Sequence, residues 1–319
     1  MIVPRYWAEC TERVQMAGRQ FTIKRFGWSN TDQIAAQENA FDRTHHAIIE
    51  LKERGQVRLV DHKVPYNGAD GLPIREEIVA EDHDIVLTRN SYGAICLNTP
   101  NVLFADIDLQ DGRHPLAHVF TIVLFLAIAF MLGDRLNANF IGVLVVYPYV
   151  SWLIDKIIKM ILGGPVANAL QTIRTFSKKN PSLNLHVYRT PNGFRVLCLS
   201  QTFDPRSEST LRLLNDLDSD PAYVRMCHNQ NCFRARITPK PWRMGISRMR
   251  PNHGCWPISN ERLPEREKWV AVYEEKSSNY SSARWLEQLG STTTVRESET
   301  VKRLHDRYCQ ADQSDLGLA

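Results

Sequence analysis

The pattern of hydrophobic and polar positions divides the chain into two mixed flanks around one strongly apolar stretch. Residues Leu116–Leu132 contain no Asp, Glu, Lys or Arg, and after a short polar break the apolar pattern resumes over Phe140–Leu162. As a helix, the first run spans about 26 Å, which is near the lower limit for crossing a bilayer. The charges of Asp155, Lys156 and Lys159 fall near the end of the second run. The pattern therefore predicts a transmembrane helical hairpin over 116–162.

Basic residues flank this predicted hairpin on its outer ends. Arg113 and His114 precede the first run, and Lys156 and Lys159 lie at the end of the second. Because cytoplasmic ends of membrane helices are enriched in such residues, we expect an inner (cytoplasmic) membrane location with the bulk of the chain in the cytoplasm. The alternative is a buried helical hairpin of a soluble protein, which the shortness of both runs and Pro148 favour.

The flank before the apolar stretch shows strand, helix and strand patterns in turn. A strand-like pair joined through Gly18 precedes a helical pattern that Ser29 or Asn30 would cap and that ends at Gly55. Three short strands follow, separated by turn-forming residues. These elements are expected at residues 5–14, 19–29, 31–55, 84–90, 92–98 and 102–109.

The flank after the apolar stretch has a similar mixture. A helix opening at Pro165 is followed by a hairpin around Pro191-Asn192-Gly193, where Asn-Gly is a strong turn signal. A further helix and a strand complete the pattern. The expected ranges are 165–181, 183–190 with 194–201, 207–227 and 232–240.

Neither flank makes a convincing domain by itself. We therefore expect an α+β fold in which a mixed or antiparallel sheet, of the RRM or palm kind, is packed by helices. Residues 1–115 and 165–309 would form one discontinuous cytoplasmic domain, 116–162 the inserted hairpin, and 310–319 a flexible tail.

Composition changes this picture little. The 319 residues are 43% hydrophobic and 23% charged, with a formal net charge of +4, a small excess that does not by itself imply a polyanionic partner. Seven cysteines are scattered along the chain and no secretory leader is evident at its start. Both features favour a reducing compartment.

Two acids interrupt the apolar strand "NVLFADIDL". Asp106 and Asp108 are separated by one residue, so on a strand they project from the same face. Two neighbouring carboxylates repel each other unless a cation compensates them, and oxygen ligands of this type suit Mg²⁺ or Mn²⁺. The alternative is a strand end at which the acids face solvent or cap the following turn.

The basic residues cluster further along the chain. Arg234 and Arg236 share one face of the strand expected in "CFRARITPKPWRMGISRMR", and an aromatic and further cations follow them. Such interleaving suits phosphate contacts and base stacking. A solvated face paired with the acids of "NDLDSD" and a surface for anionic lipid are the alternatives. The cations that follow are Lys240, Arg243, Arg248 and Arg250, with Trp242 between them.

The order of the acidic strand, a helix and the hairpin "VYRTPNGFRVLCL" resembles the palm of archaeo-eukaryotic primases and their PrimPol-like relatives over roughly residues 85–240. The resemblance implies catalytic metals at Asp106 and Asp108, nucleotide phosphates at the hairpin and a third acid on a later strand. The stretches "YRTPNGFR" and "FRARITPKPWR" are also similar to ones in bacterial proteins for which no activity is implied.

The chain departs from the primase pattern at two points. Gly193-Phe194-Arg195 stands where the family has a histidine, although Arg195 can still hold a phosphate through its planar fork of donors. The third acid has no obvious counterpart, and Glu274 and Glu275 are its candidates.

A zinc site is a further, less favoured hypothesis. Cys227, Cys232, His253 and Cys255 supply soft ligands, but their spacing is not that of a standard zinc knuckle. Free buried cysteines are the more common interpretation of such a set.

Together these features predict a membrane-tethered, primase-like protein that binds nucleotide or nucleic acid, with metal-dependent nucleotidyl transfer if it is an enzyme. Metal would be held by Asp106 and Asp108, and nucleotide by Arg189, Arg195, Arg234, Arg236 and Lys240. The alternative is a non-catalytic membrane-associated scaffold that docks anionic lipid or a protein partner.

Overall fold

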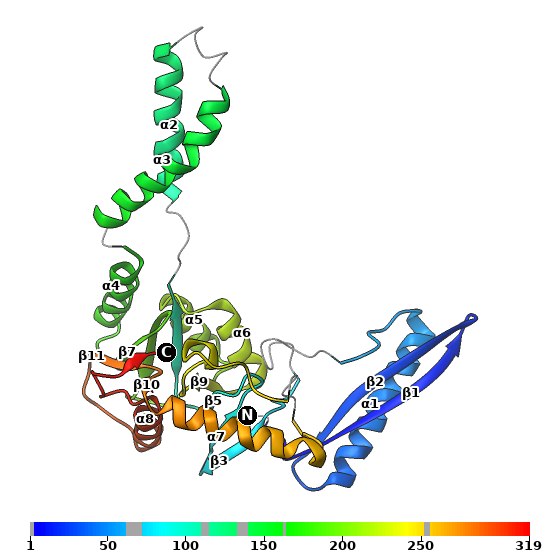
Figure 1. The fold of residues 1–319 in the computed structure, drawn as a ribbon. Helices are drawn as coiled ribbons and strands as arrows, with labels where there is room; N and C mark the ends of the chain where they lie inside the picture. The colour runs from blue at the N-terminus through cyan, green and yellow to red at the C-terminus, as the bar shows by residue number, and fades with distance from the viewer. Residues whose placement is uncertain (1–2, 62–71, 110–114, 133–139, 162–163, 252–255) are drawn as a thin grey trace.

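A computed structural model describes the chain except residues 1–2, 62–71, 110–114, 133–139, 162–163 and 252–255 (Figure 1). It is an α+β protein whose larger sheets are antiparallel, as expected. Figure 1 shows a central body, a hairpin-and-helix unit to one side and a pair of helices that extends away from the body.

The N-terminal unit is a long β-hairpin covered by one helix. Strands β1 (Tyr6–Met16) and β2 (Arg19–Ser29) pair along their full length. Helix α1 (Gln33–Arg54) begins after Asp32, whose side chain accepts a hydrogen bond from Ala35 N at 2.8 Å. Asp32, rather than Ser29 or Asn30, is thus the cap. The unit packs around its own core of Ile23, Ala47, Ile48 and Leu51. This core is separate from the large core of the body.

The first sheet of the body has the order β3-β4-β5-β9, with antiparallel neighbours. Strands β4 and β5 are buried along their whole length, and each begins with three apolar residues and ends with two polar ones. The bounds are β3 (Glu77–Asp82), β4 (Ile85–Arg89), β5 (Ile95–Thr99) and β9 (Phe233–Arg236).

The second sheet has the order β11-β7-β8-β6, also antiparallel. The acidic strand β6 therefore lies at the edge of its sheet. Its outer side lies beside β9 of the first sheet. The bounds are β6 (Phe104–Asp108), β7 (Asn184–Thr190), β8 (Gly193–Cys198) and β11 (Arg284–Gly290).

Most of the helices around these two sheets share one large core with them, whereas Trp269 and Tyr273 of the helix at 263–277 lie in a smaller cluster with Met244 and Met249. The region 207–227, expected as one helix, forms two, because Asp218 has a left-handed backbone (φ 57°) and Asp220 caps a new helix that has Pro221 in its first turn. The helices are α4 (Gly164–Lys179), α5 (Glu208–Asp216), α6 (Pro221–Gln230), α7 (Leu263–Ser277) and α8 (Arg296–Cys309), with the 3₁₀ turns η2 (Pro241–Arg243) and η3 (Asn260–Arg262).

The C-terminal segment 310–319 is part of the fold and not a flexible tail. Strand β12 (Gly317–Leu318) pairs in parallel with β10 (Tyr280–Ser281). Ala319 is 1% exposed and its N–H donates to Ser281 O at 2.9 Å. The polar composition of the segment concealed these contacts, because they are made largely by its backbone.

The apolar insert forms two helices in contact, α2 (Pro115–Leu132) and α3 (Phe140–Ile161), which project from the body in Figure 1. Within the described residues, no helix combines the length and the apolar character that crossing a membrane requires. The prediction of a transmembrane hairpin is therefore wrong. Helix α2 is 18 residues long, about 27 Å, and α3 contains Pro148 and the charged Asp155 and Lys156.

Gly27 fixes the distance between β2 and α1. A Cβ atom built at this position would lie 2.1 Å from Ala40 N and 2.3 Å from Ala36 O, both backbone atoms. We therefore expect Gly27→Ala to displace α1 and to lower the free energy of unfolding of this unit by about 1–3 kcal/mol. Urea unfolding followed by circular dichroism measures the change. Thr22→Ala, at an exposed position on the same strand, is the control. Equal stability of the two variants would contradict the close contact.

Candidate functional site

A pocket of about 210 Å³ lies where the two sheets of the body meet. Acidic, basic and aromatic side chains from both sheets and from α6 and η2 surround it. Its charged lining residues are Glu76, Asp106, Asp108, Arg195, Asp220, Arg234, Arg236, Lys240 and Arg243. Apart from Arg189, the sequence predicted six site residues, and all six line this pocket: Asp106, Asp108, Arg195, Arg234, Arg236 and Lys240.

The acidic side of the pocket is built on β6. Asp106 and Asp108 lie opposite Arg195 and Gly193 of β8, so both acids share one face of the strand, as the spacing predicts. Arg195 Nη2 lies 3.6 Å from Asp106 Oδ1. Both acids line the pocket together with Arg195. Arg195 and the two acids therefore face the same space.

A third acid joins this pair from α6. Ser219 Oγ and Asp220 N–H donate to Asp106 O at 3.2 and 2.9 Å, so the start of the helix docks on the outer edge of β6. Asp220 Oδ1 also accepts from Ala222 N at 3.0 Å. Sequence reasoning assigned Asp220 only to a possible ion-paired surface. The signal that could have found it is the Asp-Pro pair, which marks a helix start.

Asp108 is held in a setting that disfavours its charge. Burial raises the pKa of its carboxyl group, the hydrogen bond from Asn192 Nδ2 at 3.2 Å opposes this, and the charges of Asp106 and Asp220 raise the pKa further. No basic side chain among the described residues forms a salt bridge with Asp108. A cation bound beside the carboxylate would offset the cost of burying its charge and the repulsion from Asp106 and Asp220.

Arg195 forms the floor of the pocket and is 3% exposed. Its Nη1 donates to Arg236 O at 2.8 Å and lies 3.4 Å from His305 Nε2, while Nη2 faces Asp106. His305 Nδ1 in turn lies 2.9 Å from Asp306 Oδ1. A neutral imidazole that donates to Asp306 and accepts from Arg195 satisfies all of these contacts. Arg195 thus joins the acidic strand to β9 and α8.

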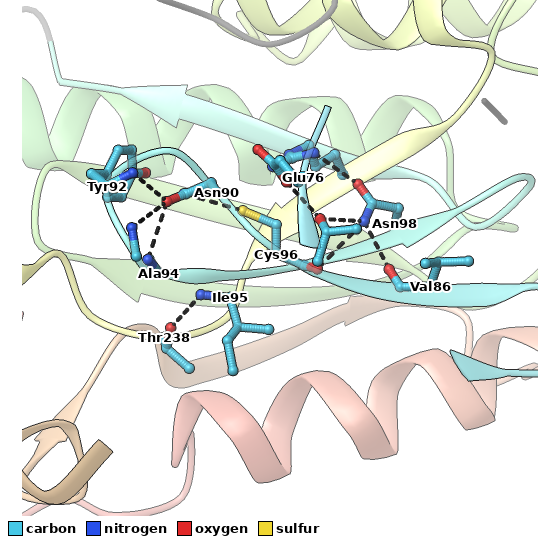
Figure 2. Close-up of polar contacts among 12 residues, drawn as sticks. Glu76, Val86, Asn90, Tyr92, Ala94, Ile95, Cys96, Asn98 and Thr238 are labelled. Atoms are coloured by element: carbon cyan, nitrogen blue, oxygen red, sulfur yellow. Dashed lines mark hydrogen bonds and ion pairs between the residues drawn. The ribbon is translucent and has the colours of Figure 1, made fainter. Parts of the chain in front are cut away.

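Arg234 is paired with Glu76 and not with the acidic strand. Its Nη2 lies 2.8 and 2.6 Å from the two carboxylate oxygens of Glu76, and its Nη1 donates to Asn98 Oδ1 at 3.1 Å. Glu76 also accepts from Thr88 Oγ1 at 2.6 Å. Figure 2 shows Glu76 and Asn98 side by side in this network. The charge of Arg234 is therefore compensated inside the protein by Glu76. This pairing does not support the predicted role of Arg234 in nucleotide binding.

The basic side of the pocket consists of Arg236, Lys240 and Arg243. Arg236 Nη1 donates to Thr238 O at 2.8 Å. Over the described part of the chain, none of the three forms a salt bridge with an acid. Burial lowers the pKa of Lys240, and the positive charges of Arg236 and Arg243 lower it further. The pKa of Arg243 is also lowered, by burial and by Arg236. Three cations thus line the pocket without a close ion pair among the described residues, although the charge of Asp108 acts on Lys240 and Arg243 from a distance.

Tyr92 enters the pocket from the turn between β4 and β5. Asn90 Oδ1 accepts from the backbone N–H groups of Tyr92, Gly93 and Ala94 at 3.1–3.2 Å, which fixes the turn (Figure 2). Burial raises the pKa of Tyr92 to about 12. The phenol is therefore a neutral hydrogen-bonding group. Sequence reasoning missed Tyr92, because Asn-Ser-Tyr-Gly indicated only a turn.

Other expected residues lie outside the pocket. Arg189 is opposite Phe194 and therefore on the other face of the sheet, where its Nη1 donates to Gly193 O at 2.5 Å. The prediction that Arg189 belongs to the site is not supported by this geometry. Glu274 forms an ion pair with Arg89 at 2.9 Å, and Glu275 is exposed on α7. Neither of these acids lines the pocket.

The expected zinc ligands are only partly described. Cys227 and Cys232 are fully buried free cysteines. Burial raises the pKa of both thiols, to about 11 for Cys232, so both are neutral. His253 and Cys255 lie outside the described residues.

No group of three or more His, Cys, Asp or Glu residues within the described ranges is arranged to hold a metal ion. Asp106, Asp108 and Asp220 line the same pocket without forming such a cluster. Any divalent ion at this position would have to take most of its ligands from water or from a bound molecule.

No family model, curated protein or solved structure matches this chain. The resemblance to primases thus stays a prediction from short sequence motifs.

The pairing of Glu76 with Arg234 gives a test of its structural role. Glu76 is 1% exposed in its side chain and Arg234 11%, so Glu76→Gln would leave a buried guanidinium without a counter-charge. We expect this variant to lower the free energy of unfolding by about 3–5 kcal/mol. Chemical denaturation measures the loss, with the exposed Glu275→Gln as control. Replacing both partners, as Glu76→Gln with Arg234→Met, should recover stability. A change below about 0.5 kcal/mol in the single variant would show that the ion pair is not required.

Proposed function

We propose that the pocket binds the phosphate groups of a nucleotide together with a divalent cation. The observation that carries this proposal is the separation of charge inside one pocket: three acids on β6 and α6 face three cations on β9 and η2. Arg195 partly compensates the acids, but among the described residues no salt bridge joins the three acids to the three cations. A phosphate with a bound metal ion has the complementary arrangement.

The cation side supplies the driving force for the phosphate. Burial lowers the pKa of Lys240 and of Arg243, and the neighbouring positive charges, Arg236 and Arg243 for Lys240 and Arg236 for Arg243, lower it further. A bound phosphate removes this repulsion and adds charge-assisted hydrogen bonds, each of which contributes about 1.5–3 kcal/mol. Three adjacent cations that form no salt bridge with any described residue therefore favour a polyvalent oxyanion over a neutral ligand.

The acid side suits a divalent ion that is shared with the ligand. Carboxylate oxygens are the ligands that Mg²⁺ prefers, and it is commonly held by one or two carboxylates plus substrate phosphates and water. Asp106 and Asp108 would hold the ion, and phosphate oxygens would complete its coordination. The absence of a preformed three-ligand cluster among the described residues is compatible with this mode. When bound, the ion would supply charge neutralisation and activation of an attacking hydroxyl.

If the site is catalytic, the reaction is nucleotidyl transfer. The alternative, a non-catalytic scaffold, would be favoured if internal ion pairs saturated the basic residues. This holds for Arg234, but among the described residues Arg236, Lys240 and Arg243 form no such pairs. The third acid beside the Asp pair also favours a ligand-processing site. For these two reasons we favour the nucleotide-binding function.

The cation side can be tested directly. Lys240→Ala with Arg243→Ala should weaken binding of ATP in the presence of Mn²⁺ by about 100-fold or more, because at least two charge-assisted contacts are lost. Thermal stability should not fall, because the substitutions relieve like-charge repulsion. Isothermal titration calorimetry measures the affinity. The matched control, Lys178→Ala with Arg225→Ala, removes two exposed cations outside the pocket.

Two further arms complete this experiment. Asp108→Asn should abolish the difference in ATP affinity between Mn²⁺ and EDTA; Asp106 is left intact because Arg195 depends on it. Unchanged affinity in the Lys240/Arg243 variant, or an equal loss in the control pair, would rule out the proposed phosphate site. Retained Mn²⁺ dependence in Asp108→Asn would rule out the metal position alone.

Binding should also depend on pH through Lys240. Burial and the neighbouring arginines place its pKa below the ordinary lysine value, and the protonated form is the one that binds phosphate. Affinity should therefore be highest below this lowered pKa and fall as pH rises through it, before an ordinary lysine with a pKa of about 10.4 would titrate. In Lys240→Arg the charge persists, so affinity should stay constant up to about pH 10. A parallel decline in wild type and variant would assign the titration to another group.

A further inference from the structure

Trp242 is a large aromatic side chain at the rim of the pocket. It lies in η2 between Lys240 and Arg243, both of which line the pocket. Its ring centroid is 5.1 Å from that of Tyr92, in an edge-on arrangement. Lys240 Nζ lies 5.7 Å and Arg248 Cζ 5.1 Å from the ring centroid. The indole is thus held beside the phosphate-sized space by one aromatic contact and two cations.

Exposure alone does not distinguish Trp242. It is 44% exposed, and Trp285 on β11 is also 44% exposed. The two differ in their surroundings: Trp285 lies on the strand farthest from β6 in its sheet, whereas Trp242 contacts two residues of the pocket wall. A half-exposed indole among cations has area available for a planar partner, and Trp285 provides a matched comparison.

The size of the pocket indicates where the rest of a ligand would lie. Its volume of about 210 Å³ is below the range of roughly 300–1,000 Å³ that is usual for sites enclosing a whole drug-sized ligand. Phosphate groups fit this space, and a base and sugar would extend beyond it. Trp242 lies at the rim, next to the cations that would hold the phosphates.

We infer that Trp242 is the surface on which the base of the nucleotide stacks while its phosphates occupy the cation side of the pocket. This inference rests on the proposed function and specifies its ligand as a nucleoside phosphate and not a free inorganic phosphate. Stacking on an indole is tolerant of base identity, because every base has a π-face. Arg248 and Lys240 lie near the ring and would also contact the stacked base or its phosphates.

The experiment compares a ligand that has a base with one that lacks it. Affinities for ATP and for inorganic tripolyphosphate are measured by calorimetry with Mg²⁺ for wild type, Trp242→Ala, Trp242→Phe and Trp285→Ala. Trp242→Ala should weaken ATP binding by about tenfold or more and change tripolyphosphate binding by less than about twofold. Trp242→Phe should retain most of the ATP affinity because its ring still stacks. Trp285→Ala should leave both affinities unchanged.

The outcomes separate this inference from the function on which it rests. Equal weakening of both ligands in Trp242→Ala, or no weakening of either, overturns the stacking role. Equal affinity of wild type for ATP and tripolyphosphate also overturns it but leaves the phosphate site intact. If wild type binds neither ligand, the proposed function itself fails. Loss of ATP affinity in Trp285→Ala as well would assign the effect to general destabilisation.

Discussion

The burial of the Arg195 guanidinium is the constraint on which the site depends. A charge that is 3% exposed must be satisfied inside the protein, and its partners come from three separate elements: Asp106 of β6, the carbonyl of Arg236 on β9, and His305 of α8. Since an unsatisfied buried charge costs several kcal/mol, these elements can adopt only arrangements that keep Arg195 paired. The relative position of the two sheets, and so the shape of the pocket between them, follows from this requirement.

Some charged residues of the pocket form ion pairs with a described residue, and others do not. Arg234 is matched by the buried Glu76, and the buried Arg195 by Asp106, which is partly exposed. The described neighbours of Lys240 and Arg243 include other cations but form no salt bridge with them, and burial together with these like charges lowers the pKa of both groups. A fold selected for stability alone would not keep like charges together in a partly buried place. Such a local cost is usual where a protein binds a ligand that supplies the missing charge.

Local patterns in the sequence predicted local structure well. The helix ending at Gly55, the Asn-Gly hairpin and the shared face of Asp106 and Asp108 all follow from short-range periodicity or turn chemistry. The rest depends on contacts between distant segments. Asp220 approaches β6 only because a helix start docks on that strand, and Arg189 fails because the register of β7 turns it to the other face. The prediction of a transmembrane hairpin was wrong, because an apolar composition does not ensure that a helix is both long enough and apolar enough to cross a membrane.

The position of β6 at the edge of its sheet explains why the site lies between the sheets. A central strand has neighbours on both sides, but β6 has β8 on one side only, and its other side is taken by the start of α6 and approached by β9. Edge strands are commonly covered in this way, which satisfies their backbone groups. Here the covering segments carry charge: α6 contributes Asp220 and β9 contributes Arg236. The protection of one strand edge therefore also assembles the acidic and basic sides of the pocket.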